Sequence, residues 1–247
     1  MASNARVVAS VSFLLALLCV QAAAQTNFDF YALGLLWPGS VCKKTAGCCK
    51  TQFAPSPVAD FFVTGLYTYS ANGPVSKCPG APFSQQLLQT ILSDLWNYWQ
   101  VIKCPSHPDN VINFWTAVWS NYGTCTGMDE VTYFTTAVNQ RKNFDVLNKL
   151  SQYQIAPNDM FYRTQVVVDA LRWAYGVKTL LFCSNDVDGK VQLQEVFICL
   201  NKITYQPIDC PASWTQQCPE RFIFHSFNVN MLGSASPMEG LLGHDSA

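Results

Sequence analysis

The segment FWTAVWSNYGTC, residues Phe114–Cys125, carries much of the information about the fold of this chain. On a helix, three aromatic residues of the segment form one ridge: Trp115, Trp119 and Tyr122. Such a ridge by itself is typical of a helix packed against a core. The segment contains no Asp, Glu, His or Lys, so it offers no strong acid or base near neutral pH.

The N-terminal residues have the three parts of a secretory signal peptide. A positive charge at Arg6 precedes the apolar run Val7–Val20, and small residues follow at Ala22 and Ala24. The apolar run is too short for a membrane-spanning helix, and no later stretch reaches the ~18 apolar residues required, so we expect no membrane contact. The expected organisation has three parts: a signal peptide over 1–24, a domain over 25–227 and a disordered tail over 228–247, which is rich in Gly, Ser and Pro.

The cysteines predict a disulfide-rich, exported protein. Of the 11 cysteines, Cys19 leaves with the signal peptide, and ten remain. An even number in an oxidising compartment indicates five disulfides. Zinc binding is the alternative, but the chain lacks paired C-x-x-C motifs, and Cys104-x-x-His107 is better explained by the Pro-bracketed turn SHPDN. We therefore expect neither a metal nor a cofactor.

The charge of the chain is nearly balanced. Without Arg6 it has 15 − 1 = 14 basic residues against 16 acidic ones, and the basic residues occur singly or in pairs. Proteins that hold nucleic acid without sequence preference usually carry a basic stripe that neutralises phosphates. This sequence contains no such stripe.

The hydrophobic pattern predicts an α+β fold. Strands are expected at 28–36, 60–69 and 192–200, the last entered through a hairpin turn at 185–189. The turn contains DVDG, which is half of a calcium-loop pattern, but the remaining ligand positions are missing and a plain turn is favoured. Helices are expected over 84–101, with one face shared by Leu87, Leu88, Ile91, Leu95 and Trp99, and over 113–121, 128–152 and 163–175, the last ended by Gly176.

Three segments taken together resemble the secreted ribonuclease T2 family, most closely its plant S-like members. FDFYALGLLWPGSVC at 28–42 resembles the family's N-terminal segment, and a Cys-Cys pair follows it at 48–49. The family's two catalytic segments, F-x-I-H-G-L-W-P and FW-x-H-E-W-x-K-H-G-T-C, align with 61–68 and 114–125. The resemblance extends from about Phe28 to Phe227. It implies a disulfide-rich α+β fold with a central antiparallel sheet flanked by helices.

The residues that perform catalysis in this family are replaced here. In the family, two histidines act as general base and acid while the RNA 2′-hydroxyl attacks its own phosphate, and a Glu, a Lys and a further His stabilise the developing charge. The resemblance places other residues at these five positions: Thr64 and Ala117 for the two histidines, Val118 for the Glu, Asn121 for the Lys and Tyr122 for the further His. Because one positioned acid or base is worth ~10²–10⁴ in rate, we predict that the protein is not an enzyme.

The resemblance also implies a substrate groove and a disulfide pattern. The groove residues are Leu36, Tyr67, Trp115 and Trp119. The implied pairs are Cys42–Cys48, Cys49–Cys104, Cys78–Cys125, Cys183–Cys218 and Cys199–Cys210. The remaining histidines, His107, His225 and His244, lie outside both catalytic segments.

Four functions stay open for a family member without its catalytic residues. The expected one is a stress-related or vegetative storage protein, for which a durable fold is sufficient. The others are weak binding of RNA or nucleotides in the old groove, weak endoribonuclease activity from a non-standard site, and binding of an unknown protein partner. Base stacking on aromatic side chains, worth ~1–3 kcal/mol per base, would support the second. We expect a monomer in the extracellular space or the vacuole, and apolar tail residues would suit a vacuolar sorting signal: Met231, Leu232, Met238, Leu241 and Leu242.

Overall fold

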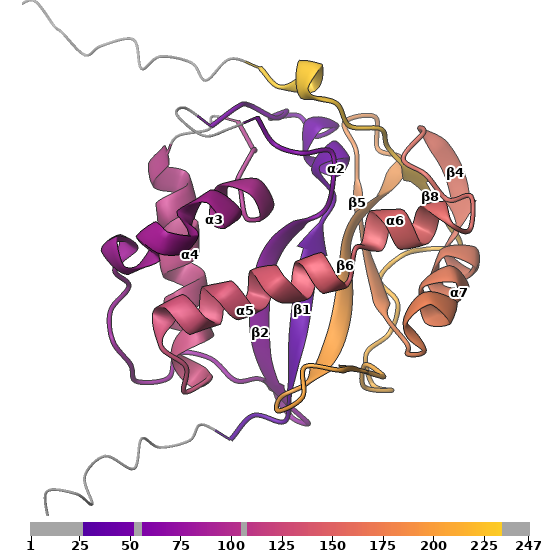
Figure 1. Ribbon diagram of the computed structural model, residues 1–247. Coiled ribbons are helices and arrows are strands. Elements are labelled where there is room, and N and C mark those ends of the chain that lie inside the picture. The colour runs from indigo at the N-terminus through magenta and orange to yellow at the C-terminus, as the bar shows by residue number, and fades with distance from the viewer. Residues whose placement is uncertain (1–26, 52–55, 105–107, 234–247) are drawn as a thin grey trace, which may run out of the picture.

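One mixed sheet of eight strands forms the centre of the computed structural model, which describes residues 27–51, 56–104 and 108–233 (Figure 1). The strands follow the order β3-β2-β1-β6-β8-β4, and β5 and β7 also pair with β6. Their bounds are β1 Phe30–Leu36, β2 Phe62–Ser70, β3 Gly73–Pro74, β4 Met160–Arg163, β5 Leu180–Asn185, β6 Val191–Asn201, β7 Pro207–Ile208 and β8 Arg221–Phe224.

The α+β class is confirmed. The three predicted strands correspond to β1, β2 and β6, and the predicted hairpin turn joins β5 to β6. The strands that the sequence pattern did not reveal are short or lie at the edge of the sheet: β3, β4, β5, β7 and β8. Such strands have too few residues for a clear alternation of apolar and polar positions.

One pairing departs from the antiparallel sheet that the resemblance implied. β6 and β8 run parallel, with Gln192 opposite Ile223. A tight hairpin cannot join parallel strands. Here residues 209–220 carry the chain from β7, which is antiparallel to β6, back to the start of β8. The central strands β2, β1 and β6 are antiparallel, as the resemblance implied, and β8 adds one parallel pair to the sheet.

The helices lie on one face of the sheet and at its sides (Figure 1). They are α2 Pro38–Cys42, α3 Leu92–Tyr98, α4 Pro108–Asn121, α5 Glu130–Asn143, α6 Val146–Ser151 and α7 Thr164–Tyr175, with 3₁₀ helices η2 Gln85–Ile91, η3 Gly123–Cys125 and η4 Val229–Met231. Gly176 ends α7 as predicted. Its φ of 74° is left-handed, a conformation that costs little only for a residue without a Cβ.

The helix predicted over 128–152 is divided into α5 and α6. Asp129 starts α5, and its Oδ1 accepts a hydrogen bond from the Thr132 amide at 2.8 Å. Asp145 starts α6 in the same way, with the Asn148 amide at 3.4 Å. An N-cap residue has a non-helical backbone, so the cap at Asp145 ends any helix that would continue through it.

The helix predicted over 84–101 begins as the 3₁₀ helix η2 and becomes α3 at Leu92. A 3₁₀ helix has three residues per turn, so Leu88 and Ile91 share a face. Leu88 is fully buried, whereas Leu87 is 56% exposed. The core position predicted for Leu87 is therefore wrong, because it assumed 3.6 residues per turn.

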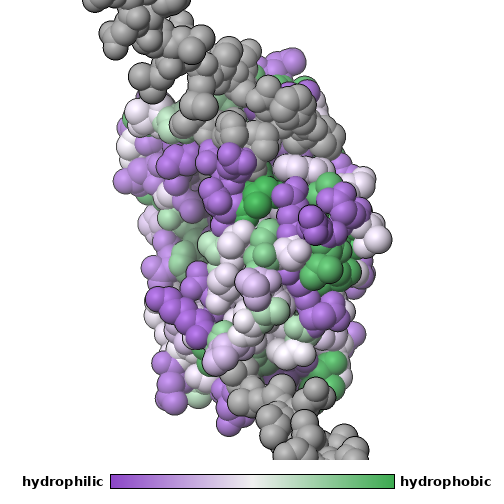
Figure 2. All heavy atoms as spheres, turned by 90° about the vertical axis from the view of Figure 1, so that its left-hand side faces the viewer, coloured by the Kyte–Doolittle hydropathy of each residue, from purple (hydrophilic) through white to green (hydrophobic). Residues whose placement is uncertain are grey.

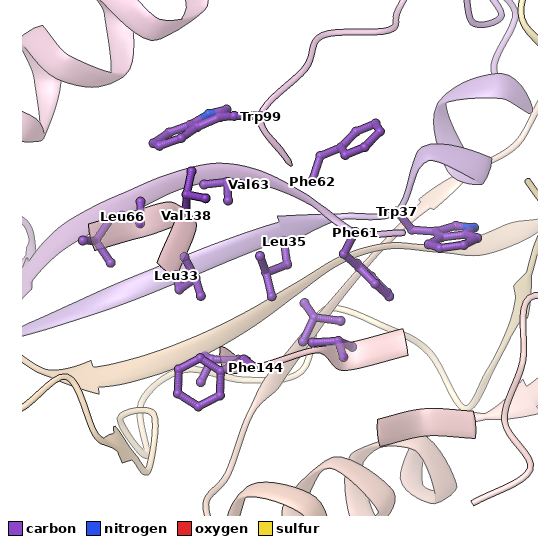
Figure 3. Close-up of a cluster of buried hydrophobic side chains, with 14 of the residues drawn as sticks. Leu33, Leu35, Trp37, Phe61, Phe62, Val63, Leu66, Trp99, Val138 and Phe144 are labelled. Carbon is purple, nitrogen blue, oxygen red and sulfur yellow. The ribbon is translucent and has the colours of Figure 1, made fainter. Parts of the chain in front are cut away.

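β1 separates two packed layers, since alternate side chains of a strand point to opposite faces of its sheet. Leu33 and Leu35 face the helices and lie fully buried in the main core, as does Trp37 after the strand (Figure 3). The helix α5 crosses this face, where the Tyr133 hydroxyl donates to the Leu66 carbonyl of β2 at 3.1 Å. Each fully buried large apolar side chain contributes about 1.5–3 kcal/mol.

The opposite face of the sheet carries a smaller cluster around Phe30. The Tyr69 ring of β2 stacks on Phe30 at 5.7 Å, and Trp214 meets Tyr69 edge-on at 4.6 Å. Residues 209–217 therefore cover part of this face. Another part of this face, formed by β2, β1 and β6, holds the candidate functional site.

Five disulfides cross-link the domain, and they are the five pairs that the resemblance implied: Cys42–Cys48, Cys49–Cys104, Cys78–Cys125, Cys183–Cys218 and Cys199–Cys210. Disulfides of this kind typically stabilise a fold by about 2–4 kcal/mol each by restricting the unfolded chain.

Residues 228–233 pack on the domain. Met231 and Leu232 contact the main core, and the Gly233 amide donates to the Cys48 carbonyl at 2.8 Å. Residues 228–233, which the sequence pattern assigned to the tail, are therefore part of the packed domain, because two apolar side chains find a surface to cover. The predicted signal peptide over 1–24 lies outside the described residues, as do the rest of the tail and three proposed sorting residues, Met238, Leu241 and Leu242.

The surface on the α3 and α4 side of the molecule is mixed. Figure 2 shows small groups of hydrophobic residues between hydrophilic ones on this side. Within the described ranges, no helix has both the length and the hydropathy that a membrane span requires.

Candidate functional site

A cavity of about 340 Å³ lies where the ends of three central strands meet α2 and α4. Its lining comes from five parts of the chain: Leu36 of β1, Val41 of α2, Val63, Thr64 and Tyr67 of β2, Gln194 and Glu195 of β6, and Gln100, Val101, Ile102, Lys103 and Phe114 from the region between α3 and α4 and from α4 itself. The cavity brings together three of the residues predicted from the sequence, Thr64, Leu36 and Tyr67.

Thr64 owes its position to a β-bulge in β2. Gly34 pairs with Gly65 and Leu35 pairs with Val63, so Thr64 is the extra residue. A bulge redirects a side chain out of the regular alternation. The Thr64 hydroxyl lies over Gly34 and donates a hydrogen bond to Oε1 of Glu195 on β6. The first degenerate catalytic position therefore carries a neutral hydroxyl bonded to a carboxyl group.

Gly34 is required for this contact. A Cβ at position 34 would lie 2.7 Å from Glu195 Oε1 and 2.9 Å from the Tyr67 ring, and it would also overlap Thr64 Oγ1. These distances are well inside van der Waals contact, so three side chains would have to move. Glycine at this position allows Thr64 and Glu195 to meet across β1.

We expect Gly34→Ala to lower the free energy of unfolding by about 1–3 kcal/mol, because overpacking a tight site costs that much. Chemical denaturation monitored by circular dichroism measures the change. The control is Gly233→Ala, whose added Cβ would make ordinary contacts at 3.6 Å. Equal stability of the two variants would contradict the tight packing over Gly34.

The Glu195 carboxyl is the main titrating group of the cavity. Burial raises the pKa of Glu195 to about 7, and the hydrogen bond from Thr64 offsets part of that rise. Burial and then the charge of Glu195 also raise the pKa of Tyr67 above its ordinary value. At neutral pH, Glu195 is therefore partly protonated, and Tyr67 is a neutral phenol.

Two lysines lie near the mouth of the cavity. Lys103 contributes to the lining, and Lys44 Nζ donates to Oε1 of Gln194 at 2.8 Å. Desolvation, followed by the charge of Lys103, lowers the pKa of Lys44. The cavity therefore combines an inner carboxyl group with cations at its edge.

The four degenerate positions on and after α4 bring no replacement chemistry. Tyr122 meets the Tyr67 ring edge-on at 4.9 Å, and the Asn121 side-chain amide donates to the Ala117 carbonyl at 2.8 Å. Val118 is buried, and Ala117 is exposed. The structure thus connects Tyr122 to the cavity through Tyr67, while none of the four supplies a carboxylate, an imidazole or an ammonium group.

Two of the four predicted groove residues lie elsewhere. Trp115 is fully buried, and its Nε1 donates to the Trp99 carbonyl at 3.0 Å. Trp119 is 3% exposed and donates to the Ala81 carbonyl at 2.9 Å. Both rings point from α4 into the core, so their placement in the groove was wrong. The rotation of α4 about its axis, which sequence spacing does not fix, decides this.

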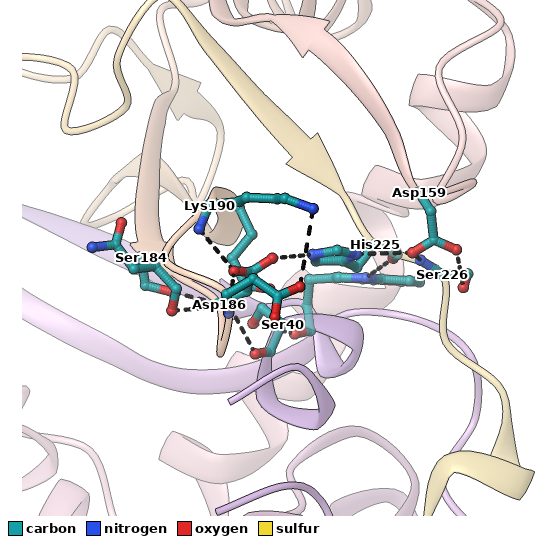
Figure 4. A network of polar contacts seen from close by, with 11 residues as sticks. Ser40, Asp159, Ser184, Asp186, Lys190, His225 and Ser226 are labelled. Atoms are coloured by element: carbon teal, nitrogen blue, oxygen red, sulfur yellow. Dashed lines mark hydrogen bonds and ion pairs between the residues drawn. The ribbon is translucent and has the colours of Figure 1, made fainter. Parts of the chain in front are cut away.

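The described histidine, His225, lies outside the cavity lining. Its Nδ1 is 2.8 Å from Asp159 Oδ1, and its Nε2 is 3.1 Å from Asp186 Oδ2 (Figure 4). His107 and His244 lie outside the described residues. Within the described part of the chain, no group of three or more His, Cys, Asp and Glu side chains could hold a metal ion.

Glu195 is the titrating residue of the cavity that sequence reasoning missed. One signal was present: Glu195 is the only charged residue in QLQEVFICL, the segment predicted as a strand. A charged residue in a buried strand is rare unless it is paired. The pattern, however, could not indicate that its partner would be Thr64, 131 residues earlier.

Comparison with known families shows which family the chain belongs to. The family model of the ribonuclease T2 family matches residues 28–210. The chain belongs to the ribonuclease T2 family. The matched residues include 61–68 and 114–125, the two segments that resemble the family's catalytic motifs, and Thr64 and Phe114 from these segments line the cavity.

Relatives in this family differ in their named roles. Ribonuclease 3 of Arabidopsis thaliana is 31% identical over 221 residues, which cover 87% of this chain and 98% of the relative. A ribonuclease-like storage protein of Panax ginseng is 29% identical and covers 74% of this chain and 75% of its own length. The crystal structure of RNase NT in complex with 5′-AMP superposes with a TM-score of 0.74 at 27% identity, over 81% of this chain and 100% of that one.

Proposed function

We propose that this protein is a ribonuclease T2 family member that does not cleave RNA. The observation that carries the proposal is the hydrogen bond from Thr64 to Glu195. The sequence resemblance matches Thr64 to the first catalytic histidine of the family. The other four positions add no carboxylate, imidazole or cation. A threonine hydroxyl does not ionise near neutral pH, so it cannot act as the general base.

Glu195 is the residue in the cavity best suited to proton transfer, but it does not by itself make a catalytic site for RNA cleavage. A carboxyl group that titrates near 7 is suitable as a general base. Transfer of a phosphoryl group also needs an acid for the leaving group and cations for the developing charge, each worth ~10²–10³ or more. Ionised Glu195 would repel the phosphate that the site must hold.

A storage or stress-related role is the physiological function that we propose. It is supported by the similarity to a relative named as a storage protein and by five disulfides, which stabilise a fold against unfolding and proteolysis. We also propose that the protein is secreted or vacuolar, on the basis of the N-terminal pattern. Relatives named as extracellular and intracellular ribonucleases of Solanum lycopersicum are compatible with both destinations.

RNA cleavage by the purified mature protein between pH 4 and 8 tests the proposal. We expect no release of acid-soluble fragments above a buffer control, with an active plant ribonuclease T2 as the positive control. Cleavage well above the buffer control would overturn the proposal. Its loss in a Glu195→Gln variant would then identify Glu195 as the base of a non-standard site.

Weak nucleotide binding is the second candidate function. The cavity persists at about 340 Å³, and a structural relative is described in complex with 5′-AMP. Phe114 and Tyr67 supply aromatic surface to the cavity. Retention of a groove without catalytic groups would suit a protein that binds but does not cleave.

A further inference from the structure

We propose that the cavity at Thr64 binds a small uncharged ligand that donates N–H groups, such as a nucleoside, in preference to the corresponding phosphate monoester. The inference rests on the second candidate function, binding in the old groove, and specifies the chemical class of ligand. It reverses the charge preference expected of a site that holds RNA phosphates.

The inner end of the cavity presents an acceptor rather than a cation. Oε1 of Glu195 accepts the hydrogen bond from Thr64, and among the described residues no partner contacts Oε2. Glu195 is only partly exposed, and it lines the cavity. A carboxylate oxygen in this position suits an N–H donor on a ligand.

The walls of the cavity suit an uncharged ring. Apolar and aromatic side chains provide most of them, among them Leu36, Val63, Phe114 and Tyr67. The volume of about 340 Å³ is within the range of small-molecule pockets. Gln194 also lines the cavity, and because its Oε1 accepts from Lys44, we infer that its side chain adds amide N–H donors.

A phosphate group at the inner end of the cavity, beside Glu195, would find no cation to pair with. On β2 the neighbours are the neutral hydroxyls of Thr64 and Tyr67, and on α4 it is the neutral Phe114. The segment after α3 contributes Lys103, an exposed residue at the mouth, and the segment after α2 contributes Lys44, whose Nζ donates to Oε1 of Gln194 at 2.8 Å. Both cations lie at the edge of the cavity, and neither contacts Glu195 in the described part of the chain. At pH 8, above the pKa of about 7, Glu195 is mostly ionised, and a phosphate placed beside it would meet a like charge.

Adenosine and 5′-AMP form a matched pair of probes, since they differ by one phosphate. We expect isothermal titration of the full chain at pH 8 to show adenosine binding at least about tenfold more tightly than 5′-AMP. Glu195→Gln keeps the size of the side chain and removes its charge, so in this variant the preference for adenosine over 5′-AMP should fall to less than about threefold. The control Glu220→Gln removes the same charge from an exposed residue at the start of β8 and should leave the tenfold preference unchanged.

Three outcomes would overturn the proposal. They are equal or tighter binding of 5′-AMP by the native protein, an unchanged preference in Glu195→Gln, and no binding of adenosine. Near-UV circular dichroism identifies variants that keep the native fold. The cleavage assay separates the two proposals, because RNA cleavage would overturn the loss of catalysis, whereas failure of adenosine to bind would overturn only the ligand class.

Discussion

RNA cleavage is expected to rise at least about 10²-fold above that of the native protein when six substitutions are combined: Thr64→His, Ala117→His, Val118→Glu, Asn121→Lys, Tyr122→His and Glu195→Gln. The first five restore the family's acid, base and charge-stabilising groups at the aligned positions. A positioned acid or base contributes ~10²–10⁴ and each electrostatic contact ~10²–10³, although the effects are not additive. Appearance of 2′,3′-cyclic phosphate ends measures the gain.

The substitution of Glu195 is the part that the tertiary structure adds. Glu195 Oε1 receives the hydrogen bond of residue 64, so a histidine placed there would lie beside a carboxylate. That charge favours the imidazolium form, which cannot accept a proton, and it repels the phosphate. We therefore expect the variant with only the first five substitutions to gain less RNA cleavage activity than the variant with all six. Equal activity of the two would show that Glu195 does not influence the site.

His225→Ala is expected to lower the free energy of unfolding by about 3 kcal/mol at pH 7. The ring lies between two carboxylates, and only the doubly protonated imidazole can donate to both (Figure 4). The Asp186 side chain is 4% exposed, so removal of the ring leaves a buried charge without this partner. Removing one member of a buried pair typically costs about 3–5 kcal/mol, and the half-exposed Asp159 places the expectation at the lower end.

Urea denaturation with matched variants tests this assignment. Adding Asp186→Asn to His225→Ala should recover at least about 1 kcal/mol, because the buried charge is removed. Asp188→Asn, in the same turn but 68% exposed, should change stability by less than about 0.5 kcal/mol. A double variant no more stable than His225→Ala would show that the charge of Asp186 is not what the ring compensates.

The cost of losing His225 should depend on pH. Desolvation opposes ionisation of both Asp159 and Asp186, but hydrogen bonds outweigh it and lower the pKa of each carboxyl. Asp159 accepts from Ser226 and His225. Asp186 accepts from the Lys190 amide and His225. A carboxyl group whose pKa is lower in the folded than in the unfolded protein stabilises the fold at pH values above its unfolded pKa of ~3.9. This stabilisation is lost as the pH falls through the pKa of the folded state. The difference between native protein and His225→Ala should therefore narrow below about pH 4.

The local pattern of the sequence determined the α+β class, and it is the basis on which we propose that the catalytic groups are lost. Strands β1, β2 and β6 could be predicted because they are long, are rich in apolar and β-branched residues, and end at turn residues. The five replaced positions could be read because each lies inside a motif whose spacing is fixed along the chain. The five disulfide pairs also followed, since the cysteines keep the order of the family.

Only the tertiary structure decided how the remaining groups meet. β1 lies between β2 and β6, and Gly34 leaves the space in which Thr64 and Glu195 contact each other across it. Neither this pairing nor the burial that raises the pKa of Glu195 is encoded in a local pattern, because both depend on strands far apart in the chain. The rotation of α4, which turned Trp115 into the core, was likewise set by packing against α3 and α5. Spacing alone indicates which residues share a helix face, whereas the direction of that face depends on the surfaces available for burial.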